Sequence, residues 1–228
     1  PYAKNPTVYR QTVTSTNTEL LSNDWPTGSS LAADIQTKGR GRYDRTWQNT
    51  PNNLSCSWKI SLPEGLSHGL TQVLLGNIVK KSFDSAKSNQ QDAKIILKWP
   101  NDLIVTAGQD WGKVCGILVE SVTLGRNTTT VAGIGINVAS EISETSFDFK
   151  IGYAEWYDKS LTREYLVNQL HCRISGLFEE KLNLPNSTMT HYFESAEDAI
   201  SEAFTISQSV FYRNKKIDFL SLNKDGTM

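Results

Sequence analysis

The 228-residue sequence lacks any run of about 18 apolar residues, so it predicts no transmembrane helix. It also has little net charge, because 23 lysines and arginines nearly balance 24 aspartates and glutamates. A formal charge of −1 does not suit the bulk electrostatic attraction that holds proteins to nucleic acid. The first residues are polar and contain no apolar signal core, so no secretory signal is predicted. We therefore expect neither a membrane nor a nucleic acid as partner.

Cysteine is scarce, with three residues in the whole chain: Cys56, Cys115 and Cys172. Their number is odd and their spacing fits no zinc site, which favours free thiols in a reducing compartment. The cytosol is therefore the expected location.

Several common functional motifs are absent as well. The sequence has no Gly-x-x-x-x-Gly-Lys-Ser/Thr run, which argues against a P-loop NTPase, and residues 39–42 do not match the dinucleotide fingerprint. His68, His171 and His191 have no matching serine or cysteine motif for a nucleophilic triad. We expect these histidines at the surface.

The pattern of apolar residues predicts an α+β fold, in which helices pack on a mixed β-sheet. Helices are expected over residues 16–21, which open with capping-box spacing at Thr16 and Glu19, and over 66–83, 166–182 and 193–204. Strands are expected over 30–35, 54–62, 95–99, 210–212 and 217–222, with a meander over 103–138 that turns near 107–110 and 124–127. Alternation within 54–62 predicts one buried face, and residues 139–160 read as a long loop. The last strands suggest a short β appendage over residues 205–228, after a main domain over 1–204.

The segment over residues 36–47 combines two glycines with three arginines and ends in Trp47. Glycine lets the backbone fold closely around a ligand, and guanidinium groups suit bidentate contacts to phosphate or carboxylate. A solvated surface loop is the alternative interpretation of this segment.

Two further segments favour a binding site. Residues 98–102, Lys-Trp-Pro-Asn-Asp, follow a buried strand, and Lys98 and Trp99 are not needed to make a turn. Residues 113–120 and 133–137 are apolar strands that carry glycines, which often mark the close approach of a ligand or another backbone. Tight packing within the sheet would explain the glycines equally well. Together the three segments suggest a site for a small organic acid and a nucleotide.

The order of these motifs resembles the catalytic domain of biotin–protein ligases over roughly residues 8–140. The matching groups are Ser15-Thr16-Asn17; Gln36 with Gly39-Arg40-Gly41-Arg42 and Trp47; Lys98-Trp99-Pro100-Asn101-Asp102; Lys113 with Gly116-Ile117-Leu118-Val119-Glu120; and Gly133 with Gly135-Ile136-Asn137. The resemblance implies a class II synthetase-like fold, with residues 1–204 as the catalytic domain and 205–228 as a short SH3-like subdomain.

The resemblance also implies a two-step reaction. Biotin and ATP, with Mg²⁺, would give biotinyl-5′-AMP and pyrophosphate, and the adenylate would then acylate one lysine of a biotin carboxyl carrier domain. The enzyme would act as a monomer or homodimer. Residues 40–47 and 139–152 would become ordered around the adenylate, which must be shielded from water.

Site residues follow from the positions that match the family. The residues implied to bind biotin are Ser15, Thr16, Asn17, Gln36, Gly39, Arg40, Gly41, Arg42, Lys113, Gly116, Gly133 and Gly135. Those implied to bind ATP or the adenylate are Arg40, Arg42, Trp47, Lys98, Asn101, Asp102 and Asn137. Arg42, Lys113 and Asp102 are the implied catalytic residues, and Asp102 is the implied Mg²⁺ ligand.

Two alternatives stay open. A lipoate or octanoate ligase would share the fold and the transfer of an acyl group to lysine. A non-catalytic biotin-binding module is suggested by Asp44, an acid within the arginine segment, and by the short C-terminal part.

Overall fold

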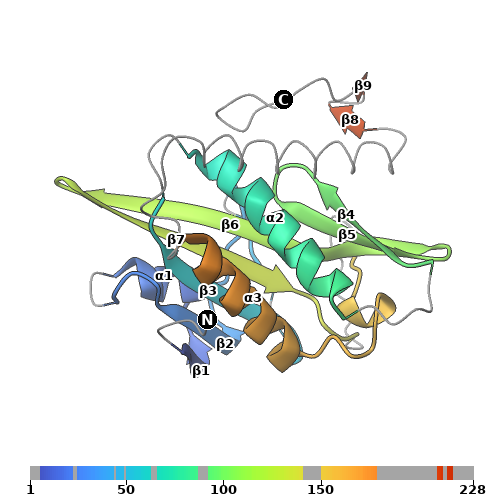
Figure 1. Ribbon diagram of the computed structural model, residues 1–228, viewed down its shortest axis with the longest axis horizontal. Helices are drawn as coiled ribbons and strands as arrows, with labels where there is room; N and C mark the ends of the chain where they lie inside the picture. The colour runs from blue at the N-terminus through green and yellow to red at the C-terminus, as the bar shows by residue number, and fades with distance from the viewer. Residues whose placement is uncertain are drawn as a thin grey trace.

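The computed structural model describes residues 6–22, 25–43, 45–48, 50–62, 66–86, 92–140 and 150–178, and the backbone of 210–212 and 215–217. Seven strands form one sheet in the order β1-β2-β3-β7-β6-β5-β4 (Figure 1). Their bounds are β1 Thr7–Val13, β2 Ser30–Gln36, β3 Leu54–Ile60, β4 Lys94–Lys98, β5 Asp102–Ala107, β6 Asp110–Leu124 and β7 Asn127–Ile136. β1 and β2 are parallel, and all other neighbours are antiparallel. The predicted α+β fold with a mixed sheet is therefore confirmed.

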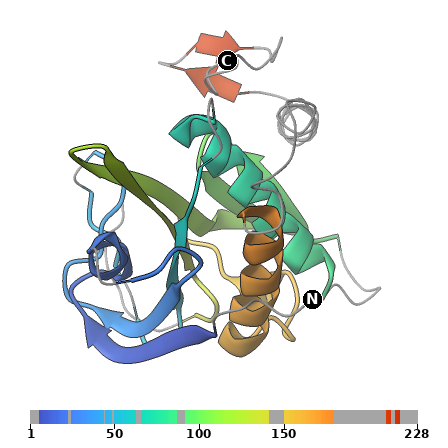
Figure 2. The same cartoon turned by 60° about the vertical axis from the view of Figure 1, so that its left-hand side comes forward.

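Helices cover both faces of this sheet. α2 (His68–Asp84) and α3 (Arg163–Phe178) lie side by side on one face (Figure 2) and bury the main core against the sheet. α1 (Thr16–Leu21) packs on β3 and β7 from the other face, over a small cluster of Leu20, Leu31 and Val131. A short 3₁₀ helix spans Ala154–Trp156. Two further strands, β8 (Val210–Tyr212) and β9 (Lys215–Ile217), pair with each other.

Strand β3 differs from its predicted burial. Every residue from Leu54 to Ile60 is buried, because α3 and the main core cover one face and α1 covers the other. Its even-numbered apolar residues join the main core, and Ser55, Ser57 and Lys59 point to the opposite side. The prediction of a single buried face is therefore wrong.

The start of α1 and the position of one histidine also differ from expectation. The cap of α1 is Ser15, whose Oγ accepts from Thr18 N at 3.5 Å, one residue before the predicted cap. His171 is buried, with Nδ1 accepting from Trp58 Nε1 at 3.2 Å, so its predicted surface position is wrong. His68 is exposed as expected.

Other boundaries shift by a few residues. The turns near 107–110 and 124–127 are confirmed, with Gly108 and Gly125 at positive φ. Strand β1 was not predicted, and β9 begins two residues before the strand expected over 217–222. Several predicted features lie outside the described residues. They are the helix expected over 193–204, residues 179–182 and 218–222, His191, Asp44 and most of the loop over 139–152.

Within the part of the chain that the structure describes, no helix combines the length and apolar character needed to cross a bilayer.

The three cysteines differ in burial, which predicts their reactivity. Cys56 and Cys115 are fully buried, and burial raises the pKa of both thiols far above the ordinary value, whereas Cys172 is exposed on α3. Because the thiolate is the reacting species, we expect a thiol reagent at mildly alkaline pH to modify Cys172 alone in the native protein. Mass spectrometry should then find one labelled site, and three after denaturation in guanidinium chloride. Fast native labelling of Cys56 or Cys115 would contradict the described core.

Candidate functional site

A cavity of about 480 Å³ opens on the face of the sheet that carries α1. Most of the predicted site residues line it: Ser15, Thr16, Asn17, Gln36, Arg40, Gly41, Arg42, Trp47, Lys98, Asn101, Asp102, Lys113, Gly116, Gly133 and Gly135. These residues come from five separate segments of the sequence. The fold therefore brings together nearly all of the residues that the motifs singled out.

Gly39 and Asn137 are the two predicted residues that do not line the cavity. A Cβ on Gly39 would lie 2.4 Å from the Trp47 carbonyl oxygen, so this glycine lets the loop close on itself. The Asn137 amide donates to the carbonyl of Lys113 at 3.0 Å and accepts from Asn53 at 3.4 Å. Both residues support the wall of the cavity from behind.

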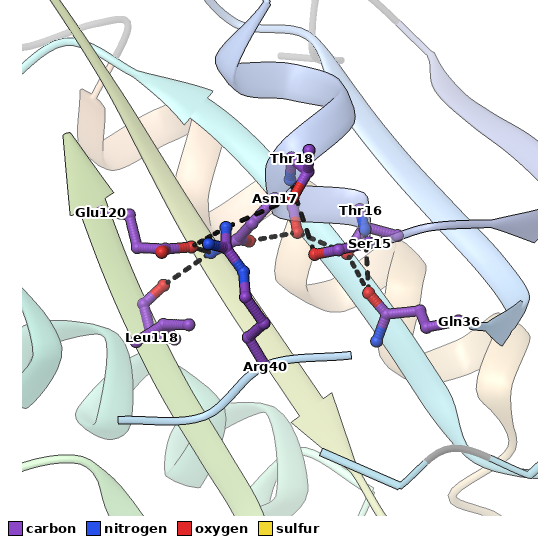
Figure 3. A network of polar contacts seen from close by, with 9 residues as sticks. Ser15, Thr16, Asn17, Thr18, Gln36, Arg40, Leu118 and Glu120 are labelled. Carbon is purple, nitrogen blue, oxygen red and sulfur yellow. Dashed lines mark hydrogen bonds and ion pairs between the residues drawn. The ribbon is translucent and has the colours of Figure 1, made fainter. Parts of the chain in front are cut away.

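One end of the cavity is a polar cluster built on the first turn of α1 (Figure 3). Gln36 Oε1 accepts from the backbone N–H of Thr16 at 2.8 Å and lies 3.1 Å from Thr16 Oγ1. Ser57 Oγ lies 2.7 Å from Thr16 Oγ1 and 2.6 Å from Asn17 Oδ1. This end can therefore exchange hydrogen bonds with a polar ligand ring.

Arg40 closes over the same cluster (Figure 3). Its guanidinium donates to Thr18 Oγ1 at 3.2 Å and to Glu120 Oε2 at 3.1 Å, and Asn17 Nδ2 donates to the same carboxylate oxygen at 2.7 Å. Arg40 is thus tied to α1 through Thr18 and to β6 through Glu120. Arg40 has an acidic partner in this structure, so a phosphate would have to compete for it.

Glycines form the floor of the cavity, where β6 and β7 run side by side. A Cβ on Gly135 would meet the Trp47 ring at 2.3 Å, and one on Gly133 would meet Asn17 Oδ1 at 2.2 Å. The glycines therefore leave room for the side chains of Trp47 and Asn17, and not only for a ligand. Trp47 Nε1 is buried without a hydrogen-bond partner among the described residues, so it can still donate to a ligand oxygen.

A β-bulge in β6 turns Lys113 into the cavity. The register with β5 skips Val114, and both Val114 and Cys115 are buried in the core. Without this extra residue, strict alternation would send Lys113 to the face opposite Gly116. The backbone of Lys113 is fixed by bonds to Lys150 O at 2.8 Å and from Gly152 N at 3.0 Å.

The Lys113 ammonium lies 2.7 Å from Asp102 Oδ1 and 5.6 Å from the centre of the Trp47 ring. Asp102 Oδ1 accepts no well-aligned hydrogen bond from the described residues, so the contact is a charge pair. Arg42 donates to Asn101 Oδ1 at 3.1 Å, and Asn101 Nδ2 donates to the Ile117 carbonyl at 3.0 Å. Cations thus occupy the middle of the cavity, next to its polar end.

Three residues of the polar end were missed by sequence reasoning. Ser55 accepts from Gln36 Nε2 at 3.1 Å, and Ser57 and Glu120 bind the side chains of α1. The signal for both serines was present, because they alternate with apolar residues in the buried strand. Glu120 belongs to the matching group over residues 113–120, but the resemblance implied no role for it.

A metal site made by the protein alone is not found among the described residues, which contain no group of three His, Cys, Asp or Glu side chains placed to hold an ion. Asp102 offers a single carboxylate, which suits Mg²⁺ only where phosphate oxygens supply further ligands.

Comparisons with known proteins identify the family of this chain. The biotin/lipoate A/B protein ligase family model matches residues 7–137. Biotin–protein ligase 2 of Arabidopsis thaliana is 33% identical over 158 residues, which cover 68% of this chain and 46% of that protein. The bifunctional ligase/repressor BirA of Bacillus spizizenii is 31% identical over 150 residues, 63% of this chain and 43% of that protein. The chain thus spans less than half the length of either relative.

Among solved structures, the biotin protein ligase of Aquifex aeolicus in complex with biotin and ATP superposes with a TM-score of 0.66 at 28% identity. The match covers 86% of this chain and 78% of that one. Since the family model covers more than half of the sequence, the chain belongs to the biotin/lipoate A/B protein ligase family.

Proposed function

We propose that this chain is a biotin–protein ligase, which activates biotin with ATP and transfers it to a lysine of a biotin carboxyl carrier domain. The observation that carries the proposal is one cavity with a polar end and a cationic middle. A biotin ring would bind at the polar end, and its carboxylate would meet the α-phosphate of ATP beside Lys113 and Arg42. The Aquifex aeolicus ligase, which holds biotin and ATP, supports the same pair of substrates.

The polar end favours biotin over lipoate. A ureido ring carries both N–H donors and a C=O acceptor, and the Thr16 hydroxyl and the Gln36 amide offer partners for each. The dithiolane ring of lipoate has no comparable donor. A ureido ring could therefore gain hydrogen bonds at this end that lipoate could not, each worth about 0.5–1.5 kcal/mol net.

The first half-reaction joins two anions. A biotin carboxylate oxygen forms a bond to the α-phosphorus, and the bond from that phosphorus to the bridging oxygen breaks as pyrophosphate leaves. Lys113 and Arg42 would hold the two acids together and stabilise the charge that develops between them. Trp47 would lie on the adenylate side, with Lys98 and Asn101 near the phosphates, and Asn137 would support this wall from behind.

Mg²⁺ fits this site only together with the phosphates of ATP. It would be held mainly by phosphate oxygens, with Asp102 as the protein ligand, and would supply charge neutralisation on the phosphates. Asp102 is paired with Lys113, so both groups would face the same phosphates.

The second half-reaction needs a neutral amine. The acceptor lysine has a pKa of about 10.4 in water and is mostly protonated near neutral pH. Asp102, in the middle of the cavity, would orient the amine and accept its proton while the nitrogen attacks the acyl carbon and AMP leaves. The three free cysteines favour a reducing compartment such as the cytosol for this reaction.

The first test is the exchange of labelled pyrophosphate into ATP. We expect exchange that depends on biotin, and a fall of about 100- to 1,000-fold in Lys113→Ala, because an oriented charge is lost where charge develops. Lys80→Ala, which loses an ion pair on α2 outside the cavity, is the matched control and should keep full activity. Exchange that depends on lipoate, or biotin binding without exchange, would refute the proposal.

The second test separates the half-reactions in Asp102→Asn. We expect single-turnover transfer from preformed biotinyl-5′-AMP to the carrier to slow by about 100-fold or more, the usual contribution of a general base. Adenylate formation, followed by pyrophosphate release, should slow by less than about tenfold, because Mg²⁺ would be held mainly by phosphate oxygens and asparagine keeps an oxygen in the same place. Equal losses in both steps would contradict the role of Asp102 as base.

A further inference from the structure

An exposed aromatic ring lies at the end of the cavity opposite to the polar cluster. Trp111 lines the cavity there, yet 52% of its surface is exposed. Among the described residues, only Tyr43 shares this combination of a large exposed apolar side chain and a place in the cavity lining. The ring of Trp111 is therefore a surface at the mouth of the cavity on which a ligand group can pack.

The cavity follows strand β6 from its polar end to this mouth. Asn17, in the polar end, donates to the Leu118 carbonyl at 3.3 Å. Towards the start of the strand, Gly116, Lys113 and then Trp111 line the cavity. Trp111 and Lys113 are two residues apart, so their Cα atoms are separated by about 7 Å. With biotin in the polar end, the Trp111 end is the one left for an acceptor lysine.

A lysine ammonium already occupies the ring of Trp111. Lys150 Nζ lies 5.7 Å from the centre of this ring and 3.6 Å from Asp110 Oδ1. The face of an aromatic ring attracts a cation, and the carboxylate supplies the opposite charge. Asp110 and Trp111 therefore form a site for an ammonium group, in which Lys150 stands in for a ligand.

Lys150 is fixed through its backbone and held only weakly through its side chain. Its carbonyl accepts from the backbone N–H of Lys113 at 2.8 Å. The side chains of Lys150 and Asp110 are 45% and 72% exposed, so water and salt screen their attraction. Exposed contacts of these kinds each shift an equilibrium by about fivefold or less. A second ammonium, brought to high local concentration by a docked protein, can therefore displace Lys150.

We infer that Trp111, with Asp110, is the docking contact for the acceptor lysine of the carrier domain, and that Lys150 competes for the same ring. This inference rests on the proposed function, for which it names the residues that guide the acceptor. The ammonium of the acceptor enters between the ring and Asp110. A lysine side chain spans about the distance from Trp111 to Lys113, so its methylene groups lie on the ring when the amine reaches the acyl carbon.

Lys150→Ala removes the competing side chain. We expect kcat/KM for a biotin carboxyl carrier domain to rise about threefold, because the ring is then open to the acceptor in every molecule. Biotin-dependent exchange of pyrophosphate into ATP should not change, since adenylate formation needs no acceptor. Lys80→Ala, which removes another lysine paired with a carboxylate, at 3.4 Å, is the matched control and should leave both rates unchanged. An unchanged or lower kcat/KM, or an equal rise in exchange, would overturn the inference.

Trp111→Leu tests the ring itself and is best made in the Lys150→Ala background. In the wild-type chain it would remove the contact of the acceptor and that of Lys150 together, and the two effects oppose each other. Without Lys150, we expect kcat/KM for the carrier to fall about fivefold, the upper range for an exposed cation–π contact. Tyr9→Leu, which removes an exposed aromatic ring outside the cavity, is the control and should change nothing.

The two substitutions must also depend on each other. Lys150→Ala should have no effect on kcat/KM in the Trp111→Leu chain, because no ring is left to compete for. Independent, additive effects would show that Lys150 acts by another route. A higher KM for ATP in the exchange reaction of Trp111→Leu would assign the ring to adenine and would overturn the inference as well.

The competition can be followed without catalysis by NMR of the Lys150 side chain. Its Cε protons should be shifted by the ring current of Trp111, and they should move to the position of an exposed lysine when the carrier domain binds. A carrier domain with alanine in place of its acceptor lysine should bind and leave them shifted. Lys150 signals that stay unchanged in the wild-type complex overturn the inference. Displacement of Lys150 in a chain without biotin-dependent exchange refutes only the proposed function.

Discussion

The position of Lys113 depends on one irregularity in the sheet, the β-bulge at Val114. Two successive residues, Val114 and Cys115, enter the core, and the strand resumes its alternation with Lys113 and Gly116 on the same side. The charge at the centre of the cavity therefore depends on backbone geometry as well as on residue type. Asn137 and the segment around Gly152 then fix the Lys113 backbone from behind.

The rest of the cavity is arranged around this charge. The glycines of β6 and β7 remove side chains from the floor, so that Trp47 and Asn17 can lie close to the sheet. Asp102 balances Lys113, and Glu120 balances Arg40, so two of the cations are already paired in the described structure. Binding of two acidic substrates would exchange these partners rather than fill an unbalanced positive site.

Much of this could be predicted from the sequence. The apolar periodicity of α2, the turn glycines at 108 and 125, and the α+β class with a mixed sheet were all predicted correctly, because each depends on local pattern. The glycine–arginine segment and the Lys113 strand were recognised as parts of one site from residue chemistry, and the structure brings them to one cavity. Their individual roles in binding and catalysis stay predictions.

The residues that escaped prediction depend on contacts between distant segments. Ser57 and His171 are polar residues whose partners lie on other elements, so their burial cannot be read from neighbouring residues. The bulge at Val114 leaves the hydrophobic pattern of β6 almost unchanged. Glu120 gains its partners only when Arg40 and Asn17 of α1 meet on β6. Such features are set by tertiary packing and require the three-dimensional arrangement.

A crystal structure of the chain with biotin and a non-hydrolysable ATP analogue tests the central claim most directly. The account predicts the ureido ring against Thr16 and Gln36, with the biotin carboxylate and the α-phosphate meeting beside the Lys113 ammonium. A biotin ring bound at the opposite end of the cavity, near Trp111 and Lys150, with Lys113 still paired only to Asp102, would contradict it.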